Sequence, residues 1–207
     1  MRLTHAHHRH GFTLVELMIT IALLAILMTL AAPSFGAWIR NTQVRTMSET
    51  MANGLRLAQS EAVRRNRQVV FFLTNDQPGL AATAADDGVN WVIRWIPLPG
   101  DTVTASAPDN EPFVQGGALS DVASGVGVTG PAAVCFNAQG RRVAASAAAT
   151  GVAGAVCTVD ASEPLAAYTL VRSGASRALR VTVALGGQVR MCDPARTLSS
   201  DAPDGCP

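Results

Sequence analysis

Histidine, the side chain best suited to acid–base and metal chemistry near neutral pH, occurs only at the N-terminal end of this 207-residue sequence. This residue, the commonest general base and metal ligand, is confined to the first ten positions, at His5, His7, His8 and His10. If that segment were removed, the remaining chain would have no histidine. The sequence also has no C-x-x-C pair and no G-x-x-x-x-G-K-[ST] phosphate loop. We therefore expect no enzymatic activity, no metal site and no cofactor.

Cysteine occurs only in the C-terminal part, at Cys135, Cys157, Cys192 and Cys206, with no histidine nearby. An even number of cysteines beyond a membrane segment is typical of disulfides formed in an oxidising compartment. Four cysteines allow three connectivities. We favour Cys135–Cys157 with Cys192–Cys206, because each bridge would close a loop rich in Gly and Ala or in Pro and Asp. Each would then stabilise the fold by about 3 kcal/mol.

Every positively charged side chain other than histidine is an arginine. Between Leu165 and Met191 there are four and no acidic residue: Arg172, Arg177, Arg180 and Arg190. A few arginine–phosphate contacts would give weak, salt-sensitive binding of nucleic acid without sequence preference. The formal net charge of +1 argues against coating of DNA by the whole surface. The alternative, which we favour, is that these arginines form the solvated face of a strand meander.

One carboxylate interrupts a long apolar run near the N-terminus. Glu16 is the single charged residue among the 21 residues from Phe12 to Ala32. As a helix this run would be about 31 Å long, the thickness of a bilayer core, and Arg2 and Arg9 would keep the preceding flank in the cytoplasm. A carboxylate in such a run costs roughly 2.5 kcal/mol or more, so Glu16 is expected to meet a partner charge.

Two ordinary explanations fit this run poorly. A secretory signal has a shorter apolar core of about 7–15 residues. A cut after Ala32 would also place Pro33 directly beyond the cleaved bond. A simple membrane anchor leaves Glu16 unexplained.

The segment Gly11–Leu17, followed by an apolar run broken at Pro33, resembles the leader and helix start of type IV pilins and type II secretion pseudopilins. The resemblance implies that a prepilin peptidase cuts between Gly11 and Phe12 on the cytoplasmic side, and that Phe12 is then N-methylated. It also implies that Glu16 meets the terminal amine of a neighbouring subunit, which would supply the missing partner charge.

Two further stretches, Leu55–Leu73 and Gly186–Pro194, resemble the GspH/FimT group of minor pilins and pseudopilins. Members resembling FimT are implicated in DNA uptake through a basic G-R-x-R strand. Here that motif falls on Gly187-Gln188-Val189-Arg190, and glutamine replaces its first arginine. This departure removes one phosphate contact and weakens the case for DNA binding.

The periodicity predicts an α+β fold, in which one long helix packs on an antiparallel β-rich domain as in pilins. Pro33 should kink the helix or break it locally. Beyond it, apolar residues recur at helical spacing on one face, at Val44, Met47, Met51, Leu55, Ala58 and Ala62. The opposite face should carry Arg45, Ser48, Glu49, Arg56, Gln59 and Arg64, and the Arg64–Arg67 cluster should cap the helix C-terminus.

Several β-strands are expected after the helix. We expect strands at Val69–Leu73, Val89–Ile96, Ala132–Phe136, Arg141–Val143, Tyr168–Arg172, Arg177–Leu185 and Gln188–Cys192. Gly186-Gly187 should make a tight two-residue turn. Pro97–Gly130 and Ala144–Glu163 look like loops. The predicted organisation is a removed leader (1–11), a membrane and filament-core helix (12–33), an amphipathic continuation (34–67) and a periplasmic β-rich domain (68–207).

Taken together, these features predict a minor pilin that takes part in assembly or initiation of a type IV pilus. Two alternatives stay open: a GspH-like minor pseudopilin of a type II secretion system, and a DNA-binding minor pilin for natural transformation. The protein would be a single-pass inner-membrane protein with its domain in the periplasm, and later part of a filament. The expected partners are other major and minor pilins or pseudopilins, the prepilin peptidase, the inner-membrane assembly platform and, before assembly, membrane lipid.

Overall fold

The computed structural model describes residues 12–98, 100–101, 111–122, 124–160, 162 and 164–207, without the side chains of 30–34, 120 and 122. The predicted leader, Gly11 included, lies outside the described residues. The chain divides into two compact units, Met1–Trp38 and Ile39–Pro207. Helix α1 (Leu14–Arg65) contributes to both, and each unit is described by itself.

The first unit exposes apolar side chains all round its helix. From Leu14 to Met28 the large apolar side chains are 53% to 75% exposed. The helix continues through Pro33 rather than ending there, as expected, and the kink at Pro33 stays a prediction. Within the described part of the chain, no helix combines the length and the apolar character of a membrane span.

The second unit buries one face of α1, as the periodicity predicted. All six residues of the expected apolar stripe are at most 1% exposed. One residue assigned to the opposite face was assigned wrongly, because Ser48 is fully buried. Its hydroxyl donates to the carbonyl of Val44 at 2.7 Å, and this bond allows a small polar side chain to lie inside the core.

The C-terminal end of α1 is closed mainly by its backbone. Asn66 adopts a left-handed conformation (φ 51°), and the amides of Asn66 and Arg67 donate to the carbonyls of Val63 and Ala62. This is the Schellman arrangement, in which Asn can replace Gly. Arg64 and Arg65, expected to cap the helix, form ion pairs with Glu61 instead.

The first sheet has the strand order β3-β2-β1-β5-β6, with every neighbouring pair antiparallel. Its strands are β1 (Val69–Thr74), β2 (Asn90–Trp95), β3 (Phe113–Ala118), β5 (Ala133–Phe136) and β6 (Arg142–Val143). All six residues of β1 are buried, because one face of this central strand meets the core against α1 and the other meets a smaller core.

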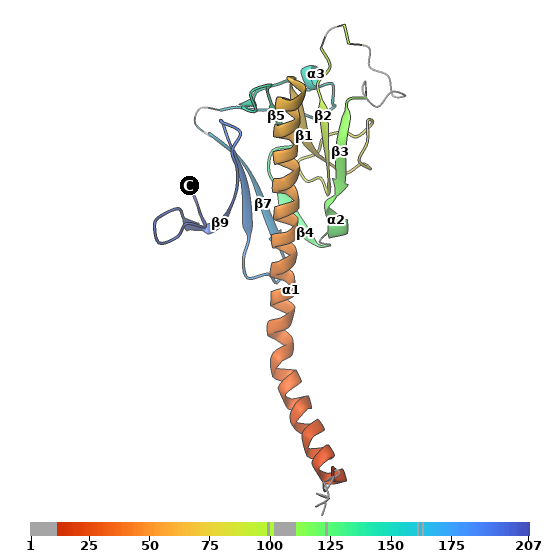
Figure 1. Ribbon diagram of the computed structural model, residues 1–207, viewed down its shortest axis with the longest axis vertical. Coiled ribbons are helices and arrows are strands. Elements are labelled where there is room, and N and C mark those ends of the chain that lie inside the picture. The colour runs from red at the N-terminus through yellow and green to blue at the C-terminus, as the bar shows by residue number, and fades with distance from the viewer. Residues whose placement is uncertain (1–11, 99, 102–110, 123, 161, 163) are drawn as a thin grey trace, which may run out of the picture. The chain divides into compact units, whose positions relative to one another are not determined.

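The second sheet has the order β10-β9-β8-β7-β4. Its strands are β4 (Val126–Thr129), β7 (Leu165–Arg172), β8 (Leu179–Ala184), β9 (Val189–Thr197) and β10 (Gly205–Cys206). Strands β4, β7 and β9 are labelled in Figure 1. The pairs are antiparallel except that β10 runs parallel to β9. Tyr168, Leu170, Val181 and Val183 from this sheet join Phe71 of β1 in the core against α1.

The turn between β8 and β9 differs from the two-glycine turn that we predicted. The amide of Gly187 donates to the carbonyl of Ala184, so the central residues of the turn are Leu185 and Gly186. Gly187 follows in the left-handed region (φ 87°). A Cβ on Gly187 would lie 1.9 Å from the carbonyl oxygen of Gly140, and therefore only glycine fits there.

The two segments expected to be loops contain regular structure. Residues 97–130 include β3, the short helix α2 (Leu119–Val122) and β4, and residues 144–163 include α3 (Ala147–Thr150). Strand β3 has no alternating pattern because it contains two glycines. A Cβ would lie 2.5 Å from the Pro78 side chain at Gly116, and 3.0 Å from the Trp91 ring at Gly117. The close packing at both positions requires glycine, and glycine gives no alternating pattern from which a strand could be predicted.

Candidate functional site

The first candidate site is the N-terminal end of α1. Thr13 immediately precedes the helix, and its Oγ1 accepts a hydrogen bond from the amide of Glu16 at 3.2 Å. The carbonyl of Thr13 accepts the amide of Leu17, also at 3.2 Å. Thr13 is therefore the N-cap and Glu16 the third helical residue, the spacing of a capping box. This cap was not predicted, although the T-x-x-E pattern of residues 13–16 indicates it.

The cap gives Glu16 a local role besides the predicted one between subunits. A carboxylate in the first turn interacts favourably with the positive end of the helix dipole. Phe12, the predicted new N-terminus, is 82% exposed directly before the cap. The cut itself and the methylation of Phe12 stay predictions, since Gly11 lies outside the described residues.

The second candidate site is a set of four arginines: Arg172 on β7, Arg177 between β7 and β8, Arg180 on β8 and Arg190 on β9. Arg177 donates to Asp193 Oδ2 from Nη2 at 2.6 Å and from Nε at 3.1 Å, and to Asp204 at 3.3 Å. Arg196 also donates to Asp204, at 2.8 Å and 2.9 Å. These bonds tie β9 to the C-terminal residues. We call residues Leu198–Pro207 the C-terminal tail.

Two carboxylates of this network have pKa values below their usual range. The pKa of Asp193 is lowered first by the backbone amide of Ala195 and then by the Arg177 guanidinium. The pKa of Asp204 is lowered mainly by its hydrogen bond from Arg196. Because hydrogen bonds and cations favour the ionised carboxylate, both aspartates hold the tail as anions.

The other three arginines also have partners within the chain. Arg190 donates to the carbonyl of Pro203 in the tail at 2.6 Å. Arg172 donates to the carbonyl of Ser124. Arg180 donates from Nε to Thr169 Oγ1 at 3.2 Å. Each arginine proposed for DNA contact thus takes part in an internal hydrogen bond, and contact with DNA stays a prediction.

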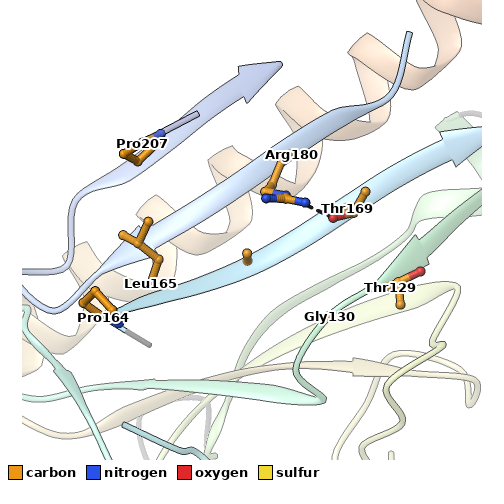
Figure 2. Close-up of a pocket in the computed structure, with 8 residues that line it drawn as sticks. Thr129, Gly130, Pro164, Leu165, Thr169, Arg180 and Pro207 are labelled. Atoms are coloured by element: carbon orange, nitrogen blue, oxygen red, sulfur yellow. Dashed lines mark hydrogen bonds between the residues drawn. The ribbon is translucent and has the colours of Figure 1, made fainter. Parts of the chain in front are cut away.

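Arg180 lines a surface groove of about 680 Å³ (Figure 2). The side chains of its remaining lining residues carry no charge: Thr129, Gly130, Pro164, Leu165, Ala167, Thr169 and Pro207. Figure 2 shows Thr169 facing Arg180 across neighbouring strands, as the pairing of these residues in β7 and β8 requires. Such a groove could accept an anion next to apolar surface.

The cysteine pairing is the sequential one that we predicted. Cys135 in β5 is joined to Cys157, and Cys192 in β9 is joined to Cys206 in β10. The second bridge therefore fixes the tail to the same strand that the Arg177–Asp193 pair holds. Across the described residues, no group of three or more His, Cys, Asp or Glu side chains is placed to bind a metal ion.

A long N-terminal helix packed on antiparallel sheets, with a T-x-x-E start to an apolar run, defines a pilin-like protein. The sequence matches the prokaryotic N-terminal methylation motif over residues 6–32. It also matches the Type II transport protein GspH family over residues 48–187. The chain belongs to this family and is a minor pilin or pseudopilin. No curated protein matches the sequence significantly.

The chain is also similar to several solved structures of pilin-like proteins. One is the type IV minor pilin FimU of Pseudomonas aeruginosa, with 14% identity, 72% of this chain and 96% of that chain covered, and a TM-score of 0.44. Another is the minor pseudopilin EpsH from the Type 2 Secretion System of Vibrio cholerae, with 11% identity, coverage of 74% and 99%, and a TM-score of 0.43. A third is E. coli GspH, with 13% identity, coverage of 77% and 94%, and a TM-score of 0.40.

Proposed function

We propose that the protein is a minor pilin of a type IV pilus, which is held in the inner membrane by its N-terminal helix until it enters the filament. The observation that carries this proposal is the N-terminal methylation motif on a helix whose apolar side chains are exposed all round. A helix that is apolar on every side needs an apolar environment, which lipid supplies first and other pilin helices supply later.

The two parts of α1 fit this double role. The apolar residues from Leu14 to Met28 are exposed, whereas the stripe from Val44 to Ala62 is buried within the second unit. The first part is therefore available for lipid or for other subunits, and the second part holds the β-rich domain. In this proposal the prepilin peptidase removes residues 1–11, and the assembly platform transfers the mature chain from the membrane to the filament.

Substitutions at the processing site and at Glu16 test the proposal in cells. Gly11→Val should leave the full-length precursor in the membrane, because the peptidase would no longer cut before Phe12. Glu16→Ala should be processed normally but enter filaments poorly, since its carboxylate would no longer meet a neighbouring amine. Immunoblots of membrane and sheared filament fractions measure both effects, and normal incorporation of both variants would refute the proposal.

A minor pseudopilin of a type II secretion system is the second candidate, and the GspH family match favours it. We prefer the pilus because a tail rich in Pro and Asp lies beyond the matched residues, where it adds an exposed surface element. Complementation separates the two: the gene should restore piliation, but not secretion, in strains that lack the corresponding minor subunit. Restoration of secretion alone would favour the pseudopilin.

DNA binding is a third candidate, supported by the placement of Arg180 in an open groove. Of the four arginines, Arg177 is already paired with two aspartates, which reduces the positive potential of this surface. A mobility-shift titration of the mature protein with duplex DNA at low and high salt tests this function. DNA binding by this surface would be excluded if no mobility shift occurs, or if the shift is unchanged in Arg180→Ala and Arg190→Ala.

A further inference from the structure

Two aromatic side chains lie exposed on the helix just beyond the apolar run. Phe35 is 62% exposed and Trp38 is 61% exposed. Their ring centroids are 5.6 Å apart, and the ring planes are inclined by 35°. Both belong to the first unit, and the second unit begins at the next residue, Ile39. The pair therefore lies at the boundary between the apolar helix and the β-rich domain.

The position of this pair along the helix corresponds to the thickness of a membrane. With a rise of 1.5 Å per residue, Phe35 lies about 32 Å and Trp38 about 36 Å along the axis from Leu14, the first helical residue. A bilayer has a hydrocarbon core of about 30 Å, and a total thickness of about 40–45 Å with its headgroups. If Phe12 lies at the cytoplasmic interface, both aromatic rings reach the interface on the opposite side.

We propose that Phe35 and Trp38 form an anchor in the outer lipid interface, which sets the depth of the unassembled subunit in the membrane. The inference rests on the membrane insertion given under the proposed function. Aromatic rings, tryptophan above all, are enriched where the hydrocarbon meets the headgroups, because an apolar ring and a polar N–H both find suitable surroundings there. The anchor would place Ile39, the first residue of the second unit, at the membrane surface.

A lipid interface explains the pair better than a neighbouring protein surface. Both rings follow shortly after the apolar run from Phe12 to Ala32, and a helix of these 21 residues matches a bilayer core in length. The apolar side chains before the pair, from Leu14 to Met28, are exposed in every direction around the helix, which suits lipid. Burial of Trp38 by another subunit is the competing outcome, and the experiment distinguishes the two.

Tryptophan fluorescence of the whole mature protein in vesicles tests the anchor. The chain has three tryptophans, and both Trp91 and Trp95 are only 5% exposed inside the second unit. The difference between the emission of the natural protein and that of Trp38→Phe therefore reports Trp38. The vesicles contain phosphatidylethanolamine and phosphatidylglycerol, with a nitroxide quencher attached either high on the acyl chain or near its end.

The anchor predicts a large loss of Trp38 emission with the shallow quencher, a smaller loss with the deep quencher, and little loss with aqueous iodide. Circular dichroism checks that Trp38→Phe folds like the natural protein. Equal quenching of Trp38 emission by the shallow and the deep nitroxide, or strong quenching by iodide, would refute the proposed anchor. Shielding of Trp38 from iodide that develops only when the protein-to-lipid ratio is raised would assign the surface to another subunit and would also overturn it.

Flotation of the same vesicles separates the two proposals. Protein that does not float with lipid contradicts the membrane insertion on which the proposed function rests. Protein that floats, but whose Trp38 lies in water or deep in the hydrocarbon, contradicts the anchor alone. Phe35→Ser with Trp38→Ser adds a test of depth, because loss of both rings should make the segment before Ile39 more accessible to added protease.

Discussion

The Nη2 atom of Arg177 lies 2.6 Å from Oδ2 of Asp193, and the Asp193 side chain is only 7% exposed. The same guanidinium reaches Asp204 in the C-terminal tail, two residues before the cysteine that is bridged to β9. An arginine that the sequence offers for contact with DNA is thus the centre of an internal network. Its role in this structure is to hold the chain terminus on the second sheet.

Replacing Arg177 should loosen the tail without unfolding the domain. Arg177→Ala removes two ion pairs, and we expect the free energy of local opening to fall by about 1 kcal/mol, because the guanidinium is partly solvent-exposed. Amide hydrogen exchange of residues 198–206 measures this effect. Arg141→Ala is the matched control, since Arg141 is exposed on the turn between β5 and β6. Unchanged exchange in the tail would show that the disulfide and the Arg190 and Arg196 contacts hold it without Arg177.

The tail should also loosen in acid. Asp193 and Asp204 have lower pKa values in the folded protein than in the unfolded chain, so their stabilisation is complete above the unfolded value of about 3.9 and is lost as the pH falls through the folded values. We expect amide protection in the tail, corrected for intrinsic exchange, to be constant from neutral pH to about pH 5 and then to decrease. Asp193→Asn should reduce this dependence. A decrease that begins near pH 6 would contradict the assignment.

Gly54 brings α1 close to the first sheet. A Cβ at this position would lie 3.1 Å from the Phe71 ring and 3.5 Å from the Trp91 ring. We expect Gly54→Leu to lower the free energy of unfolding by about 1–3 kcal/mol through overpacking, despite its better helix propensity. Urea denaturation followed by tryptophan emission measures the change. Asn53→Leu, on the neighbouring exposed position, is the control and should have little effect.

Thr13 allows the cap of α1 to be separated from the function of Glu16. Thr13→Ala removes the acceptor for the Glu16 amide and should cost about 1 kcal/mol at the helix N-terminus, whereas Thr13→Ser keeps it. Amide exchange of Glu16 in micelles reports the cap, and filament incorporation reports assembly. If Thr13→Ala reduces incorporation as strongly as Glu16→Ala, the role of Glu16 is largely that of a helix-capping residue.

The parts of the fold that depend on a regular period could be predicted from sequence. The stripe from Val44 to Ala62 and the sequential disulfides were predicted correctly, since helical spacing and short cysteine-bounded loops are local signals. Strand β3 was missed because Gly116 and Gly117 make room for side chains that come from elsewhere in the chain. Ser48 was wrongly expected on the exposed face because it is polar. Its hydroxyl is satisfied by the carbonyl of Val44 and can therefore be buried.

The ion pairs of Arg177 could not be predicted from the sequence, for a different reason. The interval from Leu165 to Met191 has no acidic residue, and it therefore looks like a positive surface in the sequence. The carboxylates that pair with Arg177, Asp193 and Asp204, lie just after that interval in the sequence. The pairing of β9 with β10 and the Cys192–Cys206 bridge hold Asp204 close to Arg177. The net charge of residues 165–191 therefore cannot predict ion pairs with carboxylates that lie outside this range and that the disulfide holds near the arginines.

The redox state of the Cys192–Cys206 pair depends on the compartment in which the domain lies. Disulfides form and persist in oxidising compartments and are rare in the reducing cytosol. If the domain is exported as proposed, a subunit that has not yet crossed the membrane should have a tail held by ion pairs and hydrogen bonds only. An exported subunit should also have the Cys192–Cys206 bridge. Electrophoresis without reductant, after rapid alkylation of free thiols, should separate these two populations and thus show how many subunits await export.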